Sequence, residues 1–521
     1  MTTPNSAIVI GAGVAGLATA GLLAKRGMDV TVIEKNDHVG GRVDEITVDG
    51  FRFEAGPSWY LMPEAFDHYF ELIGTSTEQE LDLTLLDPGY RVYSEGQPPI
   101  NLPFGVDAAA ELFESIEEGA GDALRDYLSS ADEVYQIALD RFLYTTFTSL
   151  WPFLHKDVIS QALRLVVLLT ESLKSFVDKR FADHRLRKIL QYPAVFLSSR
   201  PKKAPSMYHL MSHTDITLGV RYPQGGFVSI IRALERLAVR HGAKIRLGTE
   251  ATAIVVEDGQ ARGVRVLNDD GVAELRADIV VSAADLNHTE NSLLPKKLRT
   301  YNKRYFARRD PGLGVVLALV GVSGELPELP HHTLMFSADW SHDFAVVYDG
   351  PQATRPSGAS RSIYICKPSA TDDSVAPAGH ENLFVLIPVA ADDSLGHGDA
   401  YTGQASPAVA AIVDDALEQI GQWAGIEDLG QRVVVKRSIG PADFADRYHS
   451  WSAGAIGPAH ILSQSAFFRG KNVSSKVRGL YYAGQTTVPG VGVPMCLISA
   501  ENVLKRIDGT TDAAPMESIN G

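Results

Sequence analysis

The sequence predicts an α/β protein built on a Rossmann-like dinucleotide-binding domain, into which a helical and a mixed-sheet substrate domain are inserted. Three observations support this fold class: an N-terminal strand, glycine turn and helix; a carboxylate at the end of the next strand; and a glycine-rich strand–loop–helix segment near the C-terminus. At 521 residues the chain exceeds the size at which a single hydrophobic core keeps growing, so several domains are expected.

The N-terminal element begins with a short apolar run at residues 7–10, which predicts a buried strand, and continues into a helix over residues 17–25. Between them Gly11 permits the tight turn, Gly13 lets the backbone approach a pyrophosphate, and Gly16 lets the helix pack on the strand. Val14 and Ala15 would present backbone amides to the phosphates at the positive end of the helix.

A second strand is predicted at residues 29–33, and it ends at Glu34, followed by Lys35. A carboxylate roughly 20 residues past the glycine turn accepts hydrogen bonds from the adenosine ribose. We therefore expect Glu34 and Lys35 to bind the cofactor.

Two further segments separate flavin from nicotinamide binding. They are Gly40, Gly41 and Arg42, and then Gly56, Pro57 and Ser58. Placed directly after the ribose carboxylate, they resemble the second diphosphate clamp of the large flavoprotein family that includes amine oxidases and carotenoid desaturases. The glycine turn alone would fit any dinucleotide, whereas the combination predicts FAD.

The rest of the chain indicates that the FAD-binding domain is discontinuous. A helix is predicted at residues 228–241, with strands at residues 244–247, 251–257, 261–267 and 279–285, and Ala251 is a further candidate cofactor contact. The predicted division is residues 1–107, 222–285 and 441–507 for the FAD-binding domain; 108–221 for a helical substrate- and membrane-binding insertion; 286–440 for a substrate domain of mixed character; and 508–521 for a disordered tail.

Composition excludes several classes of function. The net charge of −15 argues against a nucleic-acid partner, which needs a basic surface. Cys366 and Cys496 are the two cysteines, which gives no disulfide framework and suits a reducing cytoplasm. No export signal opens the chain and no run of 18 apolar residues exists, so we expect a cytoplasmic protein without a membrane span.

Residues 479–494 closely resemble the C-terminal flavin signature of bacterial phytoene desaturases of the CrtI type and their carotenoid desaturase relatives. Residues 283–289, 443–449 and 464–469 also resemble blocks of that family, so the resemblance covers nearly the whole chain. It implies a fold of the glutathione-reductase/amine-oxidase type.

The C-terminal block is suited to hold the isoalloxazine ring. Its glycines allow backbone amides to approach the ring, and a helix predicted at residues 495–505 would point its N-terminus at the N1/O2 edge. Val488 stands where many relatives carry a histidine, which argues against a mechanism that needs an imidazole there. The candidate contacts are Gly484, Gly490, Val491, Gly492 and Val493.

The resemblance implies FAD-dependent desaturation of a long hydrocarbon, phytoene towards neurosporene or lycopene, with hydride transfer to flavin N5 and a quinone or oxygen as electron acceptor. Asp157 and Arg164 are its candidates for the proton-accepting group, although both also fit ordinary solvent-facing helix charges. No metal site is predicted, because His209 and His213 share a helical spacing but lack a third ligand.

A membrane-dissolved substrate requires contact with the lipid bilayer. Residues 150–154 and 162–169 are apolar, and residues 174–203 carry nine basic and two acidic side chains, which is typical of a protein that sits on anionic lipid. We expect peripheral attachment to the inner face of the cell membrane. A buried helix beside a solvated charged face is the alternative.

Other functions fit the same scaffold. The rivals are a terminal 3,4-desaturation, desaturation of a hydroxylated carotenoid, and a flavin-dependent carotene isomerisation without net oxidation. A prenyl-lipid carrier of the GDP-dissociation-inhibitor type is the least favoured, because the glycine turn, Glu34 and the Gly-Gly-Arg segment are intact.

Overall fold

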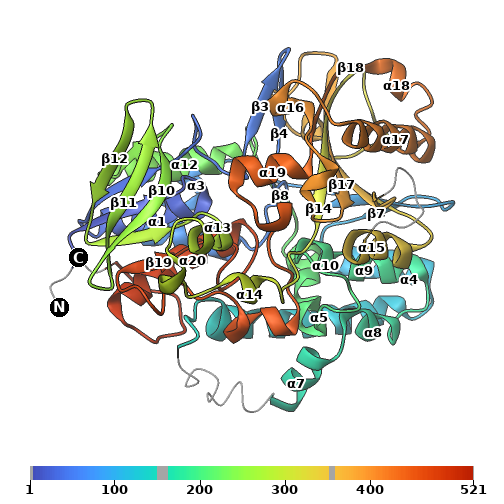
Figure 1. Ribbon diagram of the computed structural model, residues 1–521. Coiled ribbons are helices and arrows are strands. Elements are labelled where there is room, and N and C mark those ends of the chain that lie inside the picture. The colour runs from blue at the N-terminus through green and yellow to red at the C-terminus, as the bar shows by residue number, and fades with distance from the viewer. Residues whose placement is uncertain (1–3, 149–161, 351–357, 520–521) are drawn as a thin grey trace.

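The computed structural model describes residues 4–148, 162–350 and 358–519. Figure 1 shows two sheets side by side, with a layer of helices beneath the second. The first is a five-stranded parallel sheet in the order β19-β13-β1-β2-β9. Its strands are β1 (Ser6–Ile10), β2 (Asp29–Ile33), β9 (Lys244–Arg246), β13 (Ile279–Ser282) and β19 (Leu480–Tyr482).

Helices and a small sheet cover the two faces of this parallel sheet, because its strands are apolar on both sides. One face packs on α1 (Val14–Lys25), α2 (Pro63–Ile73), α12 (Val228–Arg240) and α20 (Val493–Asp508). The other packs on an antiparallel sheet of β10 (Glu250–Glu257), β11 (Gln260–Asn268) and β12 (Gly271–Arg276). The predicted Rossmann-like α/β fold is confirmed.

The substrate domain contains a seven-stranded mixed sheet in the order β18-β14-β17-β16-β15-β6-β7. The strands are β6 (Tyr90–Ser94), β7 (Ile100–Leu102), β14 (Gly314–Ser323), β15 (His332–Phe336), β16 (Ile363–Cys366), β17 (His380–Val389) and β18 (Val433–Ile439). Helix α17 (Pro407–Ala424) covers its outer face. The inner face continues into the helical insertion as one core.

Two strands of the substrate sheet, β6 and β7, come from residues 90–102. Residues 90–102 fall within the first piece of the predicted FAD-binding domain, yet β6 pairs in parallel with β15 of the substrate sheet. This pairing joins segments about 240 residues apart, and local periodicity carries no information about such a distant partner.

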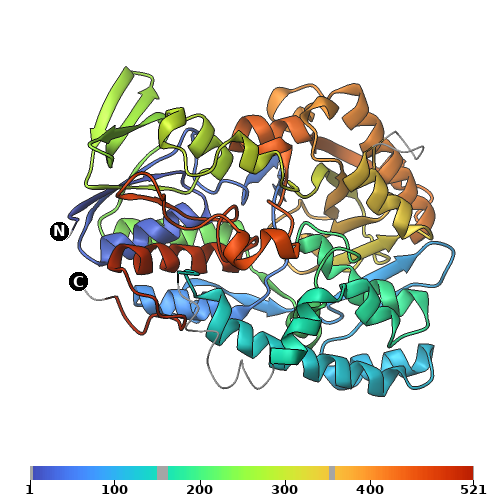
Figure 2. The same cartoon turned by 60° about the horizontal axis from the view of Figure 1, so that its bottom comes forward.

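The helical insertion forms the lower layer in Figures 1 and 2. Its helices are α4 (Val106–Ile116), α5 (Ala120–Ala138), α7 (Ala162–Thr170), α8 (Leu173–Asp178), α9 (His184–Gln191), α10 (Pro193–Phe196) and α11 (Leu210–Ser212). Helix α7 projects from the body of the molecule (Figure 1). Among the described residues, no helix combines the length and apolar character needed to cross a membrane.

Residues 508–519, for which the composition predicts disorder, lie against α20 in the structure. Ala513 is buried, and the backbone amide of Met516 donates to Glu501 Oε1 at 2.8 Å. Lys505 Nζ donates to the carbonyl of Ala514 at 2.5 Å. These contacts depend on α20 being in place, which a polar, low-complexity tail does not reveal by itself.

Candidate active site

A cavity of about 740 Å³ lies between the FAD-binding and substrate domains. One part is lined by the glycine turns and the ends of β1 and β2, at the carboxyl edge of the parallel sheet where such folds bind nucleotides. The other part is lined by apolar side chains of the helical insertion and the substrate sheet. The two parts are continuous, so a cofactor in the first would meet an apolar ligand in the second.

Two glycines of the first glycine turn, Gly13 and Gly16, have different roles. Gly11 has φ +98°, a conformation that favours glycine, and a Cβ on Gly16 would lie 1.9 Å from the Gly11 carbonyl oxygen. A Cβ on Gly13 would lie no closer than 3.6 Å to any protein atom outside its chain neighbours, although Gly13 lines the cavity. Gly16 is therefore needed for helix–strand packing, whereas Gly13 keeps space open at the N-terminus of α1.

Glu34 is buried at the end of β2 and organises the neighbouring loops. Its Oε2 accepts the Ala12 amide at 2.8 Å, and its Oε1 accepts the Asn36 backbone amide at 3.0 Å and the Asn36 side chain at 2.8 Å. A carboxylate offers about four acceptor positions, so one remains for a ribose hydroxyl.

We expect Glu34→Ala to weaken FAD binding by about 10- to 100-fold, since a hydrogen bond to a charged group contributes roughly 1.5–3 kcal/mol. Fluorescence titration of the apoprotein with FAD measures the change, and Glu34→Gln, which keeps the size of the side chain, serves as the intermediate control. An unaltered dissociation constant in Glu34→Ala would show that this carboxylate does not contact the cofactor.

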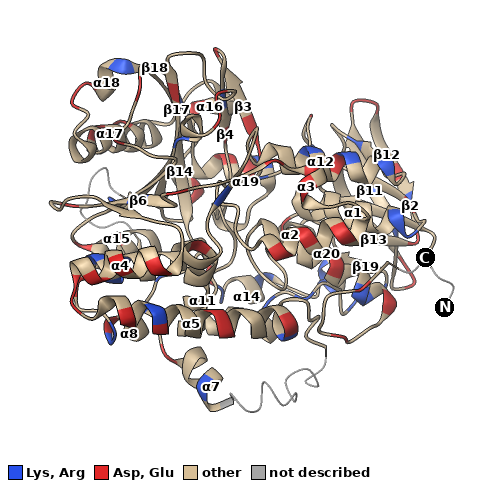
Figure 3. Ribbon diagram, turned by 180° about the vertical axis from the view of Figure 1, so that it is seen from behind, with Lys and Arg blue, Asp and Glu red and all other residues tan. Residues whose placement is uncertain are grey.

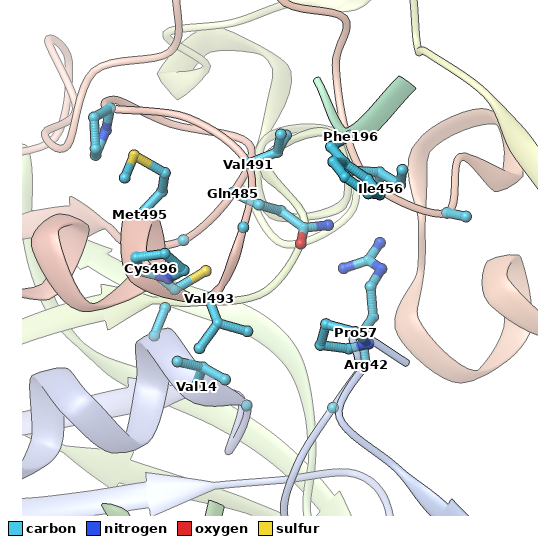
Figure 4. Close-up of a pocket in the computed structure, with 18 of the residues that line it drawn as sticks. Val14, Arg42, Pro57, Phe196, Ile456, Gln485, Val491, Val493, Met495 and Cys496 are labelled. Atoms are coloured by element: carbon cyan, nitrogen blue, oxygen red, sulfur yellow. The ribbon is translucent and has the colours of Figure 1, made fainter. Parts of the chain in front are cut away.

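The second clamp brings Arg42 into the cavity. Its Nη2 donates to Ser450 Oγ at 2.8 Å, while its buried Nε has no hydrogen-bond partner among the described residues. A Cβ on Gly56 would lie 2.0 Å from the Arg42 carbonyl oxygen, so this segment also requires a glycine for close packing. In Figure 4 Arg42 and Pro57 lie on one side of the cavity, and Gln485 lies on the other.

The loop of residues 484–492 forms the opposite wall of the first part of the cavity, which would hold the flavin. Gly484 and Gly492 have φ of +103° and +112°, which glycine adopts without strain, and Gly492 leads directly into α20. The buried Nε2 of Gln485 has no partner among the described residues. Arg42 and Gln485 therefore bring unpaired donors to one cavity, and glycines lie on both of its walls. This arrangement fits the polar groups of a flavin and its diphosphate.

Two residues that the sequence did not identify hold this loop in place. The Arg469 guanidinium is buried and donates to the carbonyls of Thr487 at 3.0 Å and Gln485 at 2.5 Å. The His460 Nε2 accepts the Val491 amide at 3.2 Å, and its Nδ1 lies 2.9 Å from the Tyr208 hydroxyl. Arg469 belongs to residues 464–469, which resemble a block of the family, whereas His460 precedes that block.

His460 bears on the expectation drawn from Val488, which concerns an imidazole at position 488 itself. An imidazole does lie beside the flavin loop, but it comes from a different segment: a Cβ on Gly490 would lie 2.3 Å from His460 Cε1. Burial lowers the pKa of His460 well below its ordinary value, so the ring is neutral. With Nε2 accepting from Val491, Nδ1 carries the proton and donates to Tyr208.

The apolar part of the cavity begins at Phe196 and Ile456, which lie next to each other beyond Arg42 in Figure 4. Other lining residues are Leu165, Leu169, Met207, Met211, Leu317, Phe384 and Leu386. At its outer end the cavity reaches α7 and residues 462–468. These two segments also expose apolar side chains, which we call the apolar rim: Leu163, Val166, Val167, Leu462, Phe467 and Phe468.

The structure gathers the candidate cofactor residues at one place. The residues that line the cavity are Gly11, Gly13, Val14, Ala15, Gly16, Glu34, Lys35, Gly40, Gly41, Arg42, Gly56, Pro57, Ser58, Ala251, Gly484, Val491, Gly492 and Val493. Gly490 is the exception: it does not line the cavity, and a Cβ there would meet the His460 ring.

The two candidates for the proton acceptor fare differently. Asp157 lies outside the described residues. Arg164 pairs with Glu133 and donates to Ser130 Oγ at 2.8 Å, and it does not line the cavity. This ion pair joins α7 to α5. His209 bonds Ser206 and Ser130 through its two ring nitrogens and is a packed histidine.

Comparison with known proteins agrees with this geometry. The model of the flavin-containing amine oxidoreductase family matches residues 14–507. The chain is 37% identical to a carotenoid 3,4-desaturase of Haloarcula japonica over 499 residues, covering 96% of this chain and 97% of that protein. It is 31% identical to a zeta-carotene-forming phytoene desaturase of Myxococcus xanthus over 500 residues, covering 96% and 93%.

Solved structures support the fold. Putrescine oxidase bound to putrescine gives a TM-score of 0.59 at 16% identity, covering 97% of this chain and 99% of that one. An oxidoreductase from Methanosarcina mazei gives 0.57 at 19% identity, covering 96% and 100%. The chain belongs to the flavin-containing amine oxidoreductase family and, within it, to the CrtI-type carotenoid desaturases, which makes it an FAD-dependent oxidoreductase.

Proposed function

We propose that the protein desaturates a long hydrocarbon carotenoid precursor, phytoene towards neurosporene or lycopene. The observation that carries this proposal is the continuity of the cavity: its apolar part opens directly onto the wall formed by Arg42 and Gln485. A substrate without polar groups suits an apolar lining, which also excludes water from the reacting carbons. A 3,4-desaturation at the end of the chain is the second candidate, favoured by the 37% identity to the Haloarcula japonica relative.

The protein's part in the reaction is to bind and orient. FAD, when bound, supplies the acceptor for the hydride that leaves the substrate. Phe196 and Ile456 would pack against the polyene beside the flavin, while Arg42 and Gln485 would hold the cofactor. Arg469 and His460 fix the loop that forms the flavin wall. Desaturation also releases a proton. Tyr208 and Tyr364 place hydroxyl groups on the lining of the cavity, but burial raises the pKa of both, so they stay protonated and the released proton passes to another group or to water.

Expression in two host strains tests the substrate assignment: one accumulates phytoene and lacks any desaturase, and the other accumulates lycopene and lacks a 3,4-desaturase. We expect a purified yellow protein and conversion of phytoene to more unsaturated carotenes, resolved by chromatography and mass. Conversion of lycopene alone, to products with terminal 3,4 double bonds, would favour the second candidate. Isomers of unchanged mass would indicate a carotene isomerase, and a colourless protein without turnover would indicate a carrier.

We also propose that the protein sits on the membrane through the apolar rim. Exposed side chains of α7, with Leu163 86% exposed and Val166 57% exposed, lie at the outer end of the cavity, so a lipid-dissolved substrate could enter there without crossing water. The segment with Trp151, Phe153 and Leu154, which the sequence favours for this contact, lies outside the described residues.

The basic stretch of residues 174–203 offers fewer free positive charges for membrane binding than its composition indicates. Five of its nine basic residues pair with carboxylates, and the ammonium group of Lys188 is buried against the Ser337 carbonyl at 2.6 Å. Figure 3 shows both red and blue segments on α8. The five paired residues are Lys174, Lys179, Arg185, Arg187 and Arg200. Apolar contact would therefore dominate binding.

Replacing Leu163, Val166 and Val167 together by serine is expected to release the protein from anionic liposomes, because each buried apolar side chain contributes roughly 1.5–3 kcal/mol. Cosedimentation measures binding, and the flavin absorption spectrum should stay unchanged. Serine at Val272 and Val434, which are exposed elsewhere on the surface, is the matched control. Full cosedimentation of the triple variant would place the membrane contact on another surface.

For the electron acceptor we propose a membrane quinone or oxygen. One glycine-rich dinucleotide turn is present in the sequence, and this turn lines the cavity proposed for FAD. Nicotinamide would therefore lack a comparable site of its own.

A further inference from the structure

A cluster of three metal-ligand residues lies behind the wall of the cavity. His332 on β15 and Cys366 on β16 are direct cross-strand partners in the substrate sheet, and His331 precedes His332. All three are at most 4% exposed, and one ligand atom from each lies within 4.8 Å of the others. Two imidazoles and a thiol at this spacing are a ligand set for a metal ion.

The hydrogen bonds of the two histidines leave one nitrogen of each ring free. His331 Nδ1 lies 2.7 Å from Thr371 Oγ1, and His332 Nδ1 lies 2.8 Å from the Tyr364 hydroxyl. Both Nε2 atoms are buried and have no hydrogen-bond partner among the described residues. A buried polar atom without a hydrogen-bond partner destabilises the fold. A histidine that binds a metal typically bonds a neighbouring group through one ring nitrogen and the metal through the other.

Burial opposes ionisation of all three side chains. Burial lowers the pKa of His331 to about 3 and that of His332 well below its ordinary value, so both rings are neutral. Burial raises the pKa of the Cys366 thiol, which would lose its proton to the solvent when an ion binds. The charged groups acting on the cluster are Lys367 and Asp372, of opposite sign, at His331, and Glu54 at Cys366.

We propose that His331, His332 and Cys366 form a buried site for a thiophilic d¹⁰ cation, Zn²⁺ or Cu⁺. A thiolate selects these ions over Mg²⁺ and Ca²⁺, which prefer oxygen ligands. Metal–ligand bonds of about 2.0–2.3 Å place ligand atoms roughly 3.5 Å apart, so binding draws the three side chains together by up to about 1 Å.

The ion would brace the wall against which the substrate lies. Tyr364 lines the cavity, and its hydroxyl bonds both His332 Nδ1 and, at 2.6 Å, Ser58 Oγ next to the cofactor clamp. Fixing His332 therefore fixes Tyr364 and Ser58. The ion cross-links β15 and β16 and stabilises the holoenzyme by mass action.

The test is metal analysis of the FAD-loaded protein from cells grown with added zinc and, separately, with added copper. We expect about one equivalent of one of the two metals per chain in the parent and in Cys496→Ala, the matched thiol control, and at least a tenfold lower content in Cys366→Ala and His331→Gln. A chelator should lower the melting temperature of the parent but leave that of Cys366→Ala unchanged. Zinc uptake and copper uptake identify which cation the site takes.

X-ray absorption at the metal edge needs no variant and covers the case in which Cys366→Ala does not fold. One sulfur and two imidazole ligands in the parent would support the site. The proposal is overturned by parent protein that retains neither metal, by equal metal content in the parent and Cys366→Ala, or by a ligand shell of oxygen alone. Loss of the metal site would leave the assignment as a carotenoid desaturase intact, because that assignment is tested by product analysis.

Discussion

Gly13→Val is expected to abolish FAD binding, with at least a 100-fold loss of affinity, while the apoprotein stays folded. Gly13 has φ −79° and ψ −175°, which valine adopts readily, and a Cβ there would lie no closer than 3.6 Å to its nearest protein neighbours, Gly40 and Gly41. The added side chain would instead occupy the space where the pyrophosphate approaches the N-terminus of α1.

Flavin content after purification and titration with FAD measure the loss, and circular dichroism with thermal melting measures the fold. Gly16→Val is the contrasting variant. A Cβ there would lie 1.9 Å from the Gly11 carbonyl oxygen, so we expect it to destabilise the protein itself. A yellow Gly13→Val protein with parental affinity would refute the placement of the diphosphate.

Ile456→Trp is expected to slow desaturation at least tenfold while FAD stays bound. Ile456 lines the apolar part of the cavity next to Phe196, beyond Arg42 (Figure 4). The indole is larger than the isoleucine side chain and would extend into the cavity. It would therefore fill space that the polyene needs beside the flavin.

Turnover of substrate in liposomes and the flavin spectrum are measured on the same preparation. Ile456→Leu, which preserves the volume of the side chain, should retain most of the activity. Parental turnover by Ile456→Trp would mean that the substrate reaches the flavin along a different path.

The sequence predicts the elements whose signals are local. The strands that end at Ile10 and Ile33 and the helix that follows the glycine turn lie within a few residues of the predicted ranges. Each is specified by a contiguous apolar pattern or by a glycine with a defined backbone role. The cofactor residues are predictable for the same reason, since a motif fixes their chemistry and spacing.

Contacts between distant segments could not be predicted. The pairing of β6 with β15, the packing of residues 508–519 on α20 and the approach of His460 to Gly490 each depend on the tertiary fold. The ion pair between Arg164 and Glu133 likewise joins α7 to α5 through a contact that the charge of Arg164 alone does not reveal. A single sequence carries no direct signal for such partners.

The most direct test of the central claim is an anaerobic mixing experiment with the FAD-loaded protein on liposomes that contain phytoene. We predict that the visible absorption of the oxidised flavin bleaches as each new double bond forms, with one FAD reduced per double bond. Subsequent addition of oxygen or a quinone should restore the oxidised spectrum, whereas NAD should not. Formation of desaturated carotenoid while the flavin stays oxidised, or reoxidation by NAD alone, would contradict the account.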